Sequence, residues 1–296
     1  MMFDAIIIGG SYAGLAAALQ LARARRQVLV LDGAQPRNRF AHAAHGFLGY
    51  DGAAPDAIRE RGRADVLAYD TTEIRSEVAT AVAGAQGDFR VTTDGGEHRA
   101  KRLVLATGVA DEMPAIPGLR ERWGKSVFHC PYCHGYELGR GRIGVIAAHP
   151  MSIHQAVLVA EWSAPGQTRF FLEDAFEPDA QQLAQLAARG VALERRRITQ
   201  VAGDAEVHVA GGEVFAFDGL FVATRTVIRD GFAAQLGCEL EEGPLGAYYK
   251  TDMMKETTVP GVFACGDVGL PMGTVAFAVA DGVRAGVATH QSLVFR

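Results

Sequence analysis

Long apolar runs, abundant cysteine and a large excess of one charge are all missing from this 296-residue sequence, and each absence excludes a class of protein. No stretch of about 18 consecutive apolar residues occurs, so the sequence predicts no transmembrane helix. Four cysteines are too few for a disulfide scaffold in a chain of this length. A formal net charge of -5 at pH 7 gives no reason to expect binding to nucleic acid or to an anionic membrane.

The start of the chain also lacks a basic segment, because Met1-Met2-Phe3-Asp4 passes directly into an apolar strand. We therefore expect a cytoplasmic protein, in a compartment where a closely spaced cysteine pair is more often catalytic than structural. Hydrophobic residues make up 49% of the sequence, enough to bury two ordinary cores. Length and composition together predict two domains.

One such cysteine pair is present, within the string HCPYCH at residues 129–134. Cys130 and Cys133 can close a small disulfide ring, and the proline between them restricts the backbone so that both sulfurs stay near each other. His129 and His134 flank the pair, and an imidazole can stabilise a thiolate or carry the proton that dithiol chemistry moves. The spacing therefore favours redox chemistry.

Three other interpretations of this string stay open. HCPYCH offers four zinc ligands, but they are crowded into residues 129–134, and the other cysteines, Cys238 and Cys265, stand singly. The string also contains the C-x-x-C-H pattern of haem attachment, which would require export and a haem-binding domain that the sequence does not indicate. A purely structural disulfide is the third. We predict no metal site.

The first part of the chain reads as a strand, a glycine-rich turn, a helix, a second strand and an acidic residue: Ala5–Ile8, Gly9–Gly14, Leu15–Ala24, Gln27–Leu31 and Asp32. This order is the dinucleotide-binding fingerprint, with a pyrophosphate at the helix N-terminus and Asp32 on a ribose hydroxyl. Ser11 stands where the middle glycine is expected, so the backbone approaches the phosphate slightly less closely. Serine is nevertheless small, and its hydroxyl can donate a hydrogen bond.

Polar segments and a hairpin follow. Arg37, Asn38 and Arg39, and the glycine-rich residues 45–52, can line a cofactor, whereas the alternating charges of the helix expected over residues 53–67 favour a solvated face. Strand signals at residues 89–93 and 102–105 enclose a turn and predict a hairpin. The second of these strands ends in the small residues Ala106-Thr107-Gly108, and a similar ending recurs at residues 262–267.

In this order and at these separations, the motifs resemble the low-molecular-weight thioredoxin reductase family: Gly9–Gly14, Asp32, Ala106–Gly108, Cys130-x-x-Cys133 and Gly261–Asp267. The resemblance covers nearly the whole chain. It implies an α/β fold of two Rossmann-like, three-layer β/β/α domains, the second inserted in the first. An FAD-binding domain would comprise residues 1–116 and 247–296, and the inserted domain, similar to an NAD(P)H-binding domain and carrying the cysteine pair, residues 117–246.

The same resemblance implies that Cys133 lies against the flavin, while the more exposed Cys130 exchanges with the substrate. Asp267 would bind the ribityl or phosphate region, and a helix starting near residues 273–276 would direct its N-terminus at the flavin ring. The residues expected to bind FAD are Gly9, Ser11, Tyr12, Ala13, Gly14, Asp32, Arg37, Asn38, Arg39, Ala106, Thr107, Gly108, Gly266, Asp267, Thr274, Val275 and Ala276.

The inserted domain departs from the family at its nucleotide turn. Aligning the two halves places Ala147, His149 and Ser152 where the first half has Gly9, Ser11 and Gly14. A bulky His149 obstructs the close approach of a pyrophosphate. The next strand ends in Glu173-Asp174, where the family's NADPH users carry basic residues, although the run at residues 195–197 can supply positive charge. Binding of NADPH or NADH is therefore doubtful.

The sequence thus predicts an FAD-dependent thiol-disulfide oxidoreductase that acts through Cys130 and Cys133. The string CPYCHGYE resembles a branch of the family that includes dithiol oxidases, in which His134 would accept the proton, with Glu137 as a weaker candidate. Two alternatives stay open: a dithiol oxidase with oxygen as acceptor, and a flavin-based redox sensor. A ferredoxin-type carrier or a second flavin is another possible electron partner.

Partners follow from the same resemblance. We expect a thioredoxin-like protein or a small disulfide or dithiol as substrate, and a homodimer to which the apolar helix at residues 285–295 contributes. Cys265 reads as a small buried hydrophobic residue, and Cys238 as a thiol without a role.

Overall fold

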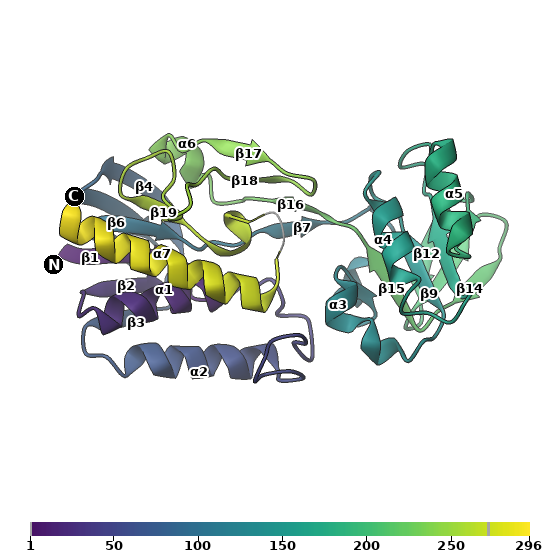
Figure 1. The fold of residues 1–296 in the computed structure, drawn as a ribbon, viewed down its shortest axis with the longest axis horizontal. Coiled ribbons are helices and arrows are strands. Elements are labelled where there is room, and N and C mark those ends of the chain that lie inside the picture. Colours follow the sequence, from purple (N-terminus) through teal and green to yellow (C-terminus); the bar gives the residue numbers. More distant parts are fainter. Residues whose placement is uncertain (1, 271–272) are drawn as a thin grey trace.

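The computed structural model describes residues 2–270 and 273–296, which form two lobes connected by two strands (Figure 1). The first lobe contains both ends of the chain, and the second is built from its middle. The connecting strands, β7 (Ala110–Glu112) and β16 (Arg225–Val227), pair antiparallel, with Ala110 opposite Val227. The chain therefore leaves the first lobe and returns to it along a single narrow hinge.

The first lobe is organised around a seven-stranded sheet. In spatial order its strands are β3 (Thr72–Arg75), β2 (Val28–Leu31), β1 (Met2–Ile8), β6 (Gly96–Leu105), β5 (Asp88–Thr93) and β4 (Ala79–Ala85), with β19 (Val262–Ala264) also paired to β6. Strands β1, β2, β3, β6 and β19 run parallel, and β4, β5 and β6 form an antiparallel meander. The predicted hairpin is confirmed, because Thr93 pairs with Gly96 across its turn.

Both faces of the parallel strands are covered, which explains why their sequences are apolar throughout. Helices α1 (Tyr12–Arg23) and α7 (Val275–Phe295) pack together on one face, and α2 (Pro55–Leu67) lies against α1 (Figure 1). The meander covers the other face, where Val82 and Phe89 share a core with Ile6. The result is the expected three-layer β/β/α arrangement.

The second lobe repeats this plan on a smaller scale. Its parallel sheet contains, in spatial order, β11 (Ala192–Glu194), β10 (Thr168–Phe171), β9 (Ile143–Ile146), β15 (Gly219–Val222) and β8 (Val127–Phe128). A three-stranded antiparallel sheet follows β11, with β12 (Ile198–Ala202), β13 (Glu206–Val209) and β14 (Val214–Ala216). The helical elements are the short η1 (Arg120–Arg122), α3 (Pro131–His134) and η2 (Tyr136–Leu138), and the longer α4 (Ser152–Val159) and α5 (Ala180–Ala188).

The return to the first lobe comes earlier than residue 247, where the sequence was expected to re-enter it. Helix α6 (Phe232–Leu236) packs against β4, and Phe232 and Cys238 belong to the same core as β1 and β6. Strands β17 (Leu240–Glu242) and β18 (Ala247–Tyr249) pair with each other in the same lobe (Figure 1). The difference has a physical cause: the apolar side chains of α6 complete the core over the meander.

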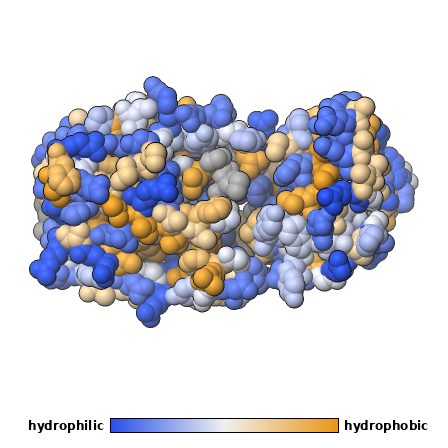
Figure 2. All heavy atoms as spheres, viewed as in Figure 1, coloured by the Kyte–Doolittle hydropathy of each residue, from blue (hydrophilic) through white to orange (hydrophobic). Residues whose placement is uncertain are grey.

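Hydrophilic and hydrophobic residues alternate over the visible face of both lobes, with apolar groups gathered along the middle of the first lobe (Figure 2). Within residues 2–270 and 273–296, no helix is both long and apolar enough to cross a membrane.

Candidate active site between the two lobes

The cysteine pair lies at the start of a short helix in the second lobe. Cys130 occupies the N-cap position of α3 (Pro131–His134), and its proline takes the first helical position, where the missing N–H costs no hydrogen bond. This one turn brings the two Cα atoms to 5.3 Å, and a disulfide joins Cys130 to Cys133. Both residues are half-buried, so the pair is reachable from the space beside it.

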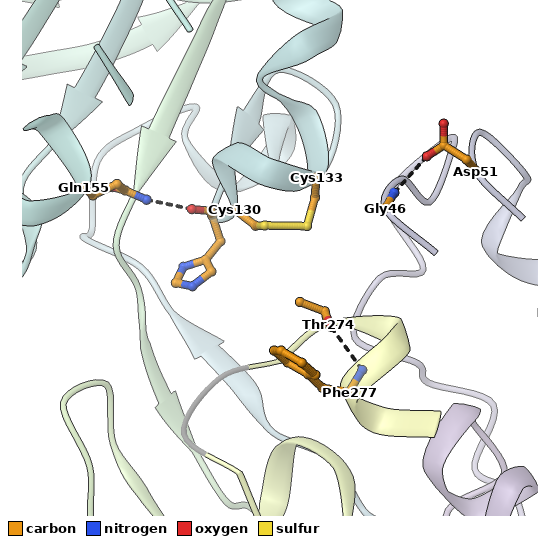
Figure 3. The surroundings of a disulfide bond; sticks show 8 residues. Gly46, Asp51, Cys130, Cys133, Gln155, Thr274 and Phe277 are labelled. Atoms are coloured by element: carbon orange, nitrogen blue, oxygen red, sulfur yellow. Dashed lines mark hydrogen bonds between the residues drawn. A yellow bond between two sulfur atoms is a disulfide. The ribbon is translucent and has the colours of Figure 1, made fainter. Parts of the chain in front are cut away.

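That space is bounded by the first lobe (Figure 3). The loop that carries Gly46 and Asp51 lies to one side of the disulfide, and the first turn of α7, with Thr274 and Phe277, lies below it in this view. The hydroxyl oxygen of Thr274 accepts a hydrogen bond from the Phe277 amide at 3.1 Å and caps the helix. The helix expected near residues 273–276 is therefore present, and it begins opposite the redox pair.

His129 is held by contacts from the second lobe and from the hinge. Its carbonyl oxygen accepts a hydrogen bond from Gln155 at 2.7 Å, and its Nδ1 lies 3.3 Å from the Thr224 hydroxyl, which donates to Asp111 at 2.7 Å. Burial lowers the pKa of His129, and the positive charge of Arg37 lowers it further, against the opposing effect of Asp111. This imidazole is therefore neutral at pH 7.

His134 has different surroundings. Its ring stacks on Phe128, with 4.3 Å between the ring centroids, and its Nδ1 is buried without a hydrogen-bond partner. Glu137, on η2 (Tyr136–Leu138), is exposed. Burial lowers the pKa of His134, and the nearby His45 lowers it further, whereas Glu137 and the backbone of Cys130 raise it. A neutral His134 can accept a proton next to Cys133.

The glycine turn of the first lobe has the shape that the sequence predicts. Gly9 adopts φ +118°, and a Cβ there would overlap the carbonyl oxygen of Ala106, while a Cβ on Gly14 would overlap that of Gly9. Ser11 is the N-cap of α1, yet its side chain caps no amide of the helix. Tyr12 and Ala13 begin the helix. The N-terminus of α1 is thus left open toward an anion.

Asp32 directly follows β2 as expected, and both of its carboxylate oxygens accept hydrogen bonds within the protein. One carboxylate oxygen accepts a hydrogen bond from the Ala34 amide at 2.8 Å, and the other accepts from Arg63 at 2.9 Å. Arg63 lies on α2, whose charges the sequence assigned to a solvated face, so for this residue the interpretation was wrong. The alternating charges along α2 do not indicate which charged side chain turns toward the sheet.

Arg37 and Asp267, both expected at the cofactor, contact each other. The Arg37 guanidinium donates two hydrogen bonds to Asp111, at 2.9 and 2.6 Å, and one to Asp267 at 2.9 Å. Burial alone would raise the pKa of Asp111, but Arg37 and Thr224 outweigh it and lower that pKa. The sequence did not predict Asp111 or Thr224, which join the hinge strands to this network.

Other expected residues form a second polar group. Asn38 donates to the Tyr12 hydroxyl at 3.0 Å, and that hydroxyl donates to the Pro55 carbonyl at 3.1 Å. The side-chain oxygen of Asn38 is buried without a hydrogen-bond partner. Arg39 is exposed, with its guanidinium 4.2 Å from the centre of the Phe40 ring. An orphaned buried oxygen beside an open helix N-terminus fits a bound dinucleotide such as FAD.

The remaining expected cofactor residues gather at the carboxyl ends of β6 and β19, which pair in parallel. Ala106, Thr107 and Gly108 follow β6, and the Thr107 hydroxyl donates to Asp230 at 2.5 Å. Gly266 begins η3 (Gly266–Val268) after β19, and its amide donates to Asp281 at 2.9 Å. Val275 and Ala276 form the first turn of α7. One edge of the sheet thus assembles these segments from both ends of the chain.

The corresponding turn of the second lobe is filled by its own side chains. The hydroxyl oxygen of Ser152 accepts hydrogen bonds from the amides of Ala148 at 3.0 Å and His149 at 3.4 Å. His149 is only 4% exposed, and its Nε2 has no partner. Ala147, at the position of Gly9, is fully enclosed. The turn amides that would hold a pyrophosphate already have an acceptor.

Carboxylates also pair with the basic residues nearby. Arg195 contacts Glu177, Arg196 contacts Glu194 and Glu213, and Arg197 lies 3.9 Å from Asp174. Glu173 accepts a hydrogen bond from the Ile198 amide, and burial raises its pKa. The positive charge at residues 195–197 is therefore balanced locally.

No group of three or more potential ligands in the described part of the chain is arranged to hold a metal ion. Cys238 and Cys265 are buried and carry free thiols. Burial raises the pKa of both, as expected for cysteines that act as small apolar residues.

Comparisons with known proteins agree with this architecture. The model of the pyridine nucleotide-disulphide oxidoreductase family matches residues 3–282. Thioredoxin reductase sirT of Leptosphaeria maculans is 32% identical, over 96% of this chain and 92% of that protein, and thioredoxin reductase tcpT of Claviceps purpurea is 33% identical over the same shares. The crystal structure of an oxidoreductase from Agrobacterium tumefaciens is 53% identical and superposes with a TM-score of 0.96, over 100% of this chain and 99% of that one.

These matches extend over nearly the full length of this chain and of each similar protein, so they concern both lobes. The family and its thioredoxin reductases imply FAD as the cofactor. The chain belongs to the pyridine nucleotide-disulphide oxidoreductase family and is a thioredoxin reductase-like, FAD-dependent disulfide oxidoreductase.

Proposed function

We propose that this protein passes an electron pair between FAD and a dithiol or disulfide substrate through Cys130 and Cys133, without ordinary binding of NADPH. The position of the disulfide opposite the first turn of α7 is the observation that carries the proposal (Figure 3). FAD, when bound, would link the two-electron dithiol/disulfide couple to a donor or acceptor that does not exchange thiols, such as dioxygen. The residues expected to hold it are those gathered at the carboxyl ends of β1, β6 and β19.

The chain's own residues divide the remaining work. Cys130, at the start of α3, exchanges with the substrate, and Cys133 faces the flavin. His134 takes up or returns the proton of the exchanging thiol, because its pKa is lowered and the residue directly follows Cys133. Glu137 stabilises the imidazolium that forms.

The filled turn of the second lobe supports the part of the proposal that concerns NADPH. Ser152 occupies the amides of Ala148 and His149, and Glu173 lies at the end of β10, where a 2′-phosphate would meet negative charge. Electrons then enter either from another donor, for reduction of a thioredoxin-like protein or a small disulfide, or from a dithiol.

The same observation favours a second candidate, a dithiol oxidase. Without a pyridine nucleotide, a substrate dithiol can itself supply the electrons: its two S–H groups become one disulfide, and dioxygen takes up both electrons and both protons as hydrogen peroxide. This reaction balances with no reductant beyond the substrate.

Anaerobic rapid mixing tests these functions. The purified yellow protein is mixed separately with NADPH, NADH and dithiothreitol, and flavin absorbance is followed near about 450 nm. Bleaching by the dithiol alone, with recovery in air, supports the oxidase, and bleaching by NADPH contradicts the proposal for the second lobe. Variants Cys130→Ser and Cys133→Ser should abolish reduction by the dithiol. A wild-type protein that turns over no acceptor faster than it autoxidises would instead be a redox sensor.

We also propose that the chain forms a homodimer through α7. Val287, Val294 and Phe295 are exposed on this helix, and Phe295 is 79% exposed. Sedimentation of the holoprotein tests this expectation, and a monomer at micromolar concentration would contradict it.

A further inference from the structure

A closed loop of the first lobe holds one histidine toward the redox centre. Residues 44–53 are tied at their base, where the Ala44 amide donates to the Ala53 carbonyl at 2.8 Å and the Gly52 amide donates to the Ala44 carbonyl at 2.9 Å. Inside the loop, the Gly46 amide donates to Asp51 at 2.8 Å (Figure 3). These bonds fix the backbone on both sides of His45.

The His45 side chain reaches across to the second lobe. Its Nδ1 lies 3.5 Å from a carboxylate oxygen of Asp51 on its own loop and 3.5 Å from one of Glu137 on η2. The imidazole is 20% exposed, so it contacts both carboxylates and retains access to water. This contact between His45 and Glu137 thus connects the first lobe to the three-residue segment η2, which follows the cysteine helix.

Glu137 in turn belongs to the surroundings of His134. Two side chains from opposite lobes shift the pKa of His134 in opposite directions: His45 lowers it, and Glu137 raises it, as does the backbone of Cys130. Because the ring of His134 is half-buried and stacked on Phe128, water screens these two side chains less than it would at the surface.

We propose that His45 is a positioning residue of the redox centre, which acts through Glu137 to set the protonation state of His134 while the two lobes have this orientation. The inference rests on the proposed function of Cys130 and Cys133. It concerns only the exchange of thiols with the protein disulfide, which both candidate functions share.

That exchange balances without a further reactant. One substrate thiol attacks the sulfur of Cys130, the bond between Cys130 and Cys133 breaks, and Cys133 leaves as a thiolate. The thiol proton moves to His134, which returns it to Cys133. The second substrate thiol then attacks the mixed disulfide, and Cys130 leaves and takes up a proton. A substrate dithiol and a protein disulfide become a substrate disulfide and a protein dithiol, and the reverse sequence serves a reductase.

The test compares two variants with opposite charge effects. His45→Gln removes the imidazole that lowers the pKa of His134, so this pKa should rise, whereas Glu137→Gln removes a carboxylate that raises it and should lower it. Each shift should be about half a pH unit, typical of one partly solvated charge. His42→Gln is the matched control, because His42 is exposed three residues earlier in the same segment.

Two measurements on the holoprotein read these shifts. NMR titration of the His134 ring, assigned with His134→Gln, gives the midpoint directly. The rate at which dithiothreitol reduces the disulfide, measured by quenched alkylation and mass spectrometry, is expressed as the ratio of variant to wild type at each pH. This ratio cancels the titration of the reagent itself.

Opposite displacements of the midpoint in His45→Gln and Glu137→Gln, with no displacement in His42→Gln, support the inference. Midpoints that stay at the wild-type value, or move in the same direction in both variants, overturn it and assign these side chains a purely structural role. A wild-type disulfide that dithiothreitol does not reduce would instead contradict the proposed function, and the NMR midpoints would still decide the coupling.

Discussion

The two lobes place the same strand–turn–helix unit at the same position in their sheets, yet the two turns differ in what their amides contact. In the first lobe, the N-cap Ser11 leaves the N-terminus of α1 open, and Gly9 and Gly14 allow the backbone segments to approach closely. In the second, the Ser152 hydroxyl occupies the turn amides, and His149 is buried next to it.

This difference teaches that a nucleotide fold and a nucleotide site are separable. The sheet of the second lobe is held by buried strands such as Ile143–Ile146 and Gly219–Val222, none of which depends on the turn. Its packing is therefore compatible with turn amides that a side chain of the protein already occupies. The first lobe cannot lose its glycines in the same way, because any side chain there would displace backbone rather than solvent.

The largest difference between the two lobes should appear when one residue is substituted in each turn. Gly14→Ala places a Cβ against the Gly9 carbonyl and should weaken FAD binding by at least about 100-fold, about 2.7 kcal/mol. Ser152→Ala, the corresponding change in the second lobe, should leave the flavin content unchanged. Flavin absorbance per chain after gel filtration measures both. A Gly14→Ala protein that retains a full complement of FAD would contradict our description of the first turn.

The next largest effect should come from the buried ion pair that holds the Gly266 backbone in the first lobe. Lys255 and Asp281 form an ion pair of 3.2 Å with both side chains 5% exposed, and Asp281 also accepts the Gly266 amide. Lys255→Met leaves a buried carboxylate unpaired and should cost about 3–5 kcal/mol in urea unfolding at pH 7. Lys250→Met, which removes an exposed pair with Glu239, is the control and should cost less than about 1 kcal/mol.

The pH dependence of that loss checks its cause. Burial raises the pKa of Asp281, and Lys255 opposes the rise, so the unpaired carboxyl of the variant should titrate at a still higher pH. A group whose pKa is raised by folding favours the folded state at low pH and loses that contribution as the pH rises through the folded value. The deficit of Lys255→Met should therefore shrink between pH 7 and pH 4. A deficit that is constant over this range would indicate lost packing instead.

The fold was predictable from sequence because short stretches of residues indicate its strands and turns. Apolar strands ending in glycine turns or acids, such as Ala5–Ile8 before Gly9, identify both halves, and the order of motifs identifies the family. The hairpin ending at Leu105 followed from its turn residues. The exception was the expected domain boundary at residue 247, since α6 packs into the core of the first lobe through contacts that no local pattern reveals.

The candidate site was predictable only where its reactive or binding residues lie close together in the sequence. Cys130, Cys133 and the first turn needed no tertiary information. Arg63 and His45 were not predicted because each acts on a residue from a distant segment: Arg63 contacts Asp32, and His45 contacts Glu137 across the lobes. A charge on a helix or loop does not indicate its partner until the elements are packed.

Substitutions that free the turn amides of the second lobe test the same comparison and should have a smaller effect. The triple variant Ala147→Gly, His149→Gly and Ser152→Gly frees the amides and the crevice, and should give weak NADH binding, with a Kd of about 1 mM. NADPH should bind less well, because Glu173 would repel its 2′-phosphate. Anaerobic flavin reduction by each nucleotide measures the gain, with the Ser152→Gly single variant as control. Equal reduction of wild type and triple variant by NADH would show that the turn does not govern access.

The smallest expected effect concerns the histidine that fills the second turn. Burial lowers the pKa of His149, and Arg225 lowers it further, so the folded state binds its proton less readily than the unfolded state. Its contribution to stability is therefore fully present above the ordinary pKa of about 6.5 and is lost as the pH falls through the folded value. In His149→Gln this dependence should disappear. The difference in unfolding free energy between wild type and variant should then change by at most about 1.4 kcal/mol per unit of pKa shift as the pH falls from 7.5 to 5.

His154→Gln, at an exposed position of α4, is the control and should follow the wild type throughout. Parallel curves for wild type and His149→Gln would mean that His149 accepts a proton where it lies, and that the crevice is more open to water than its 4% exposure indicates.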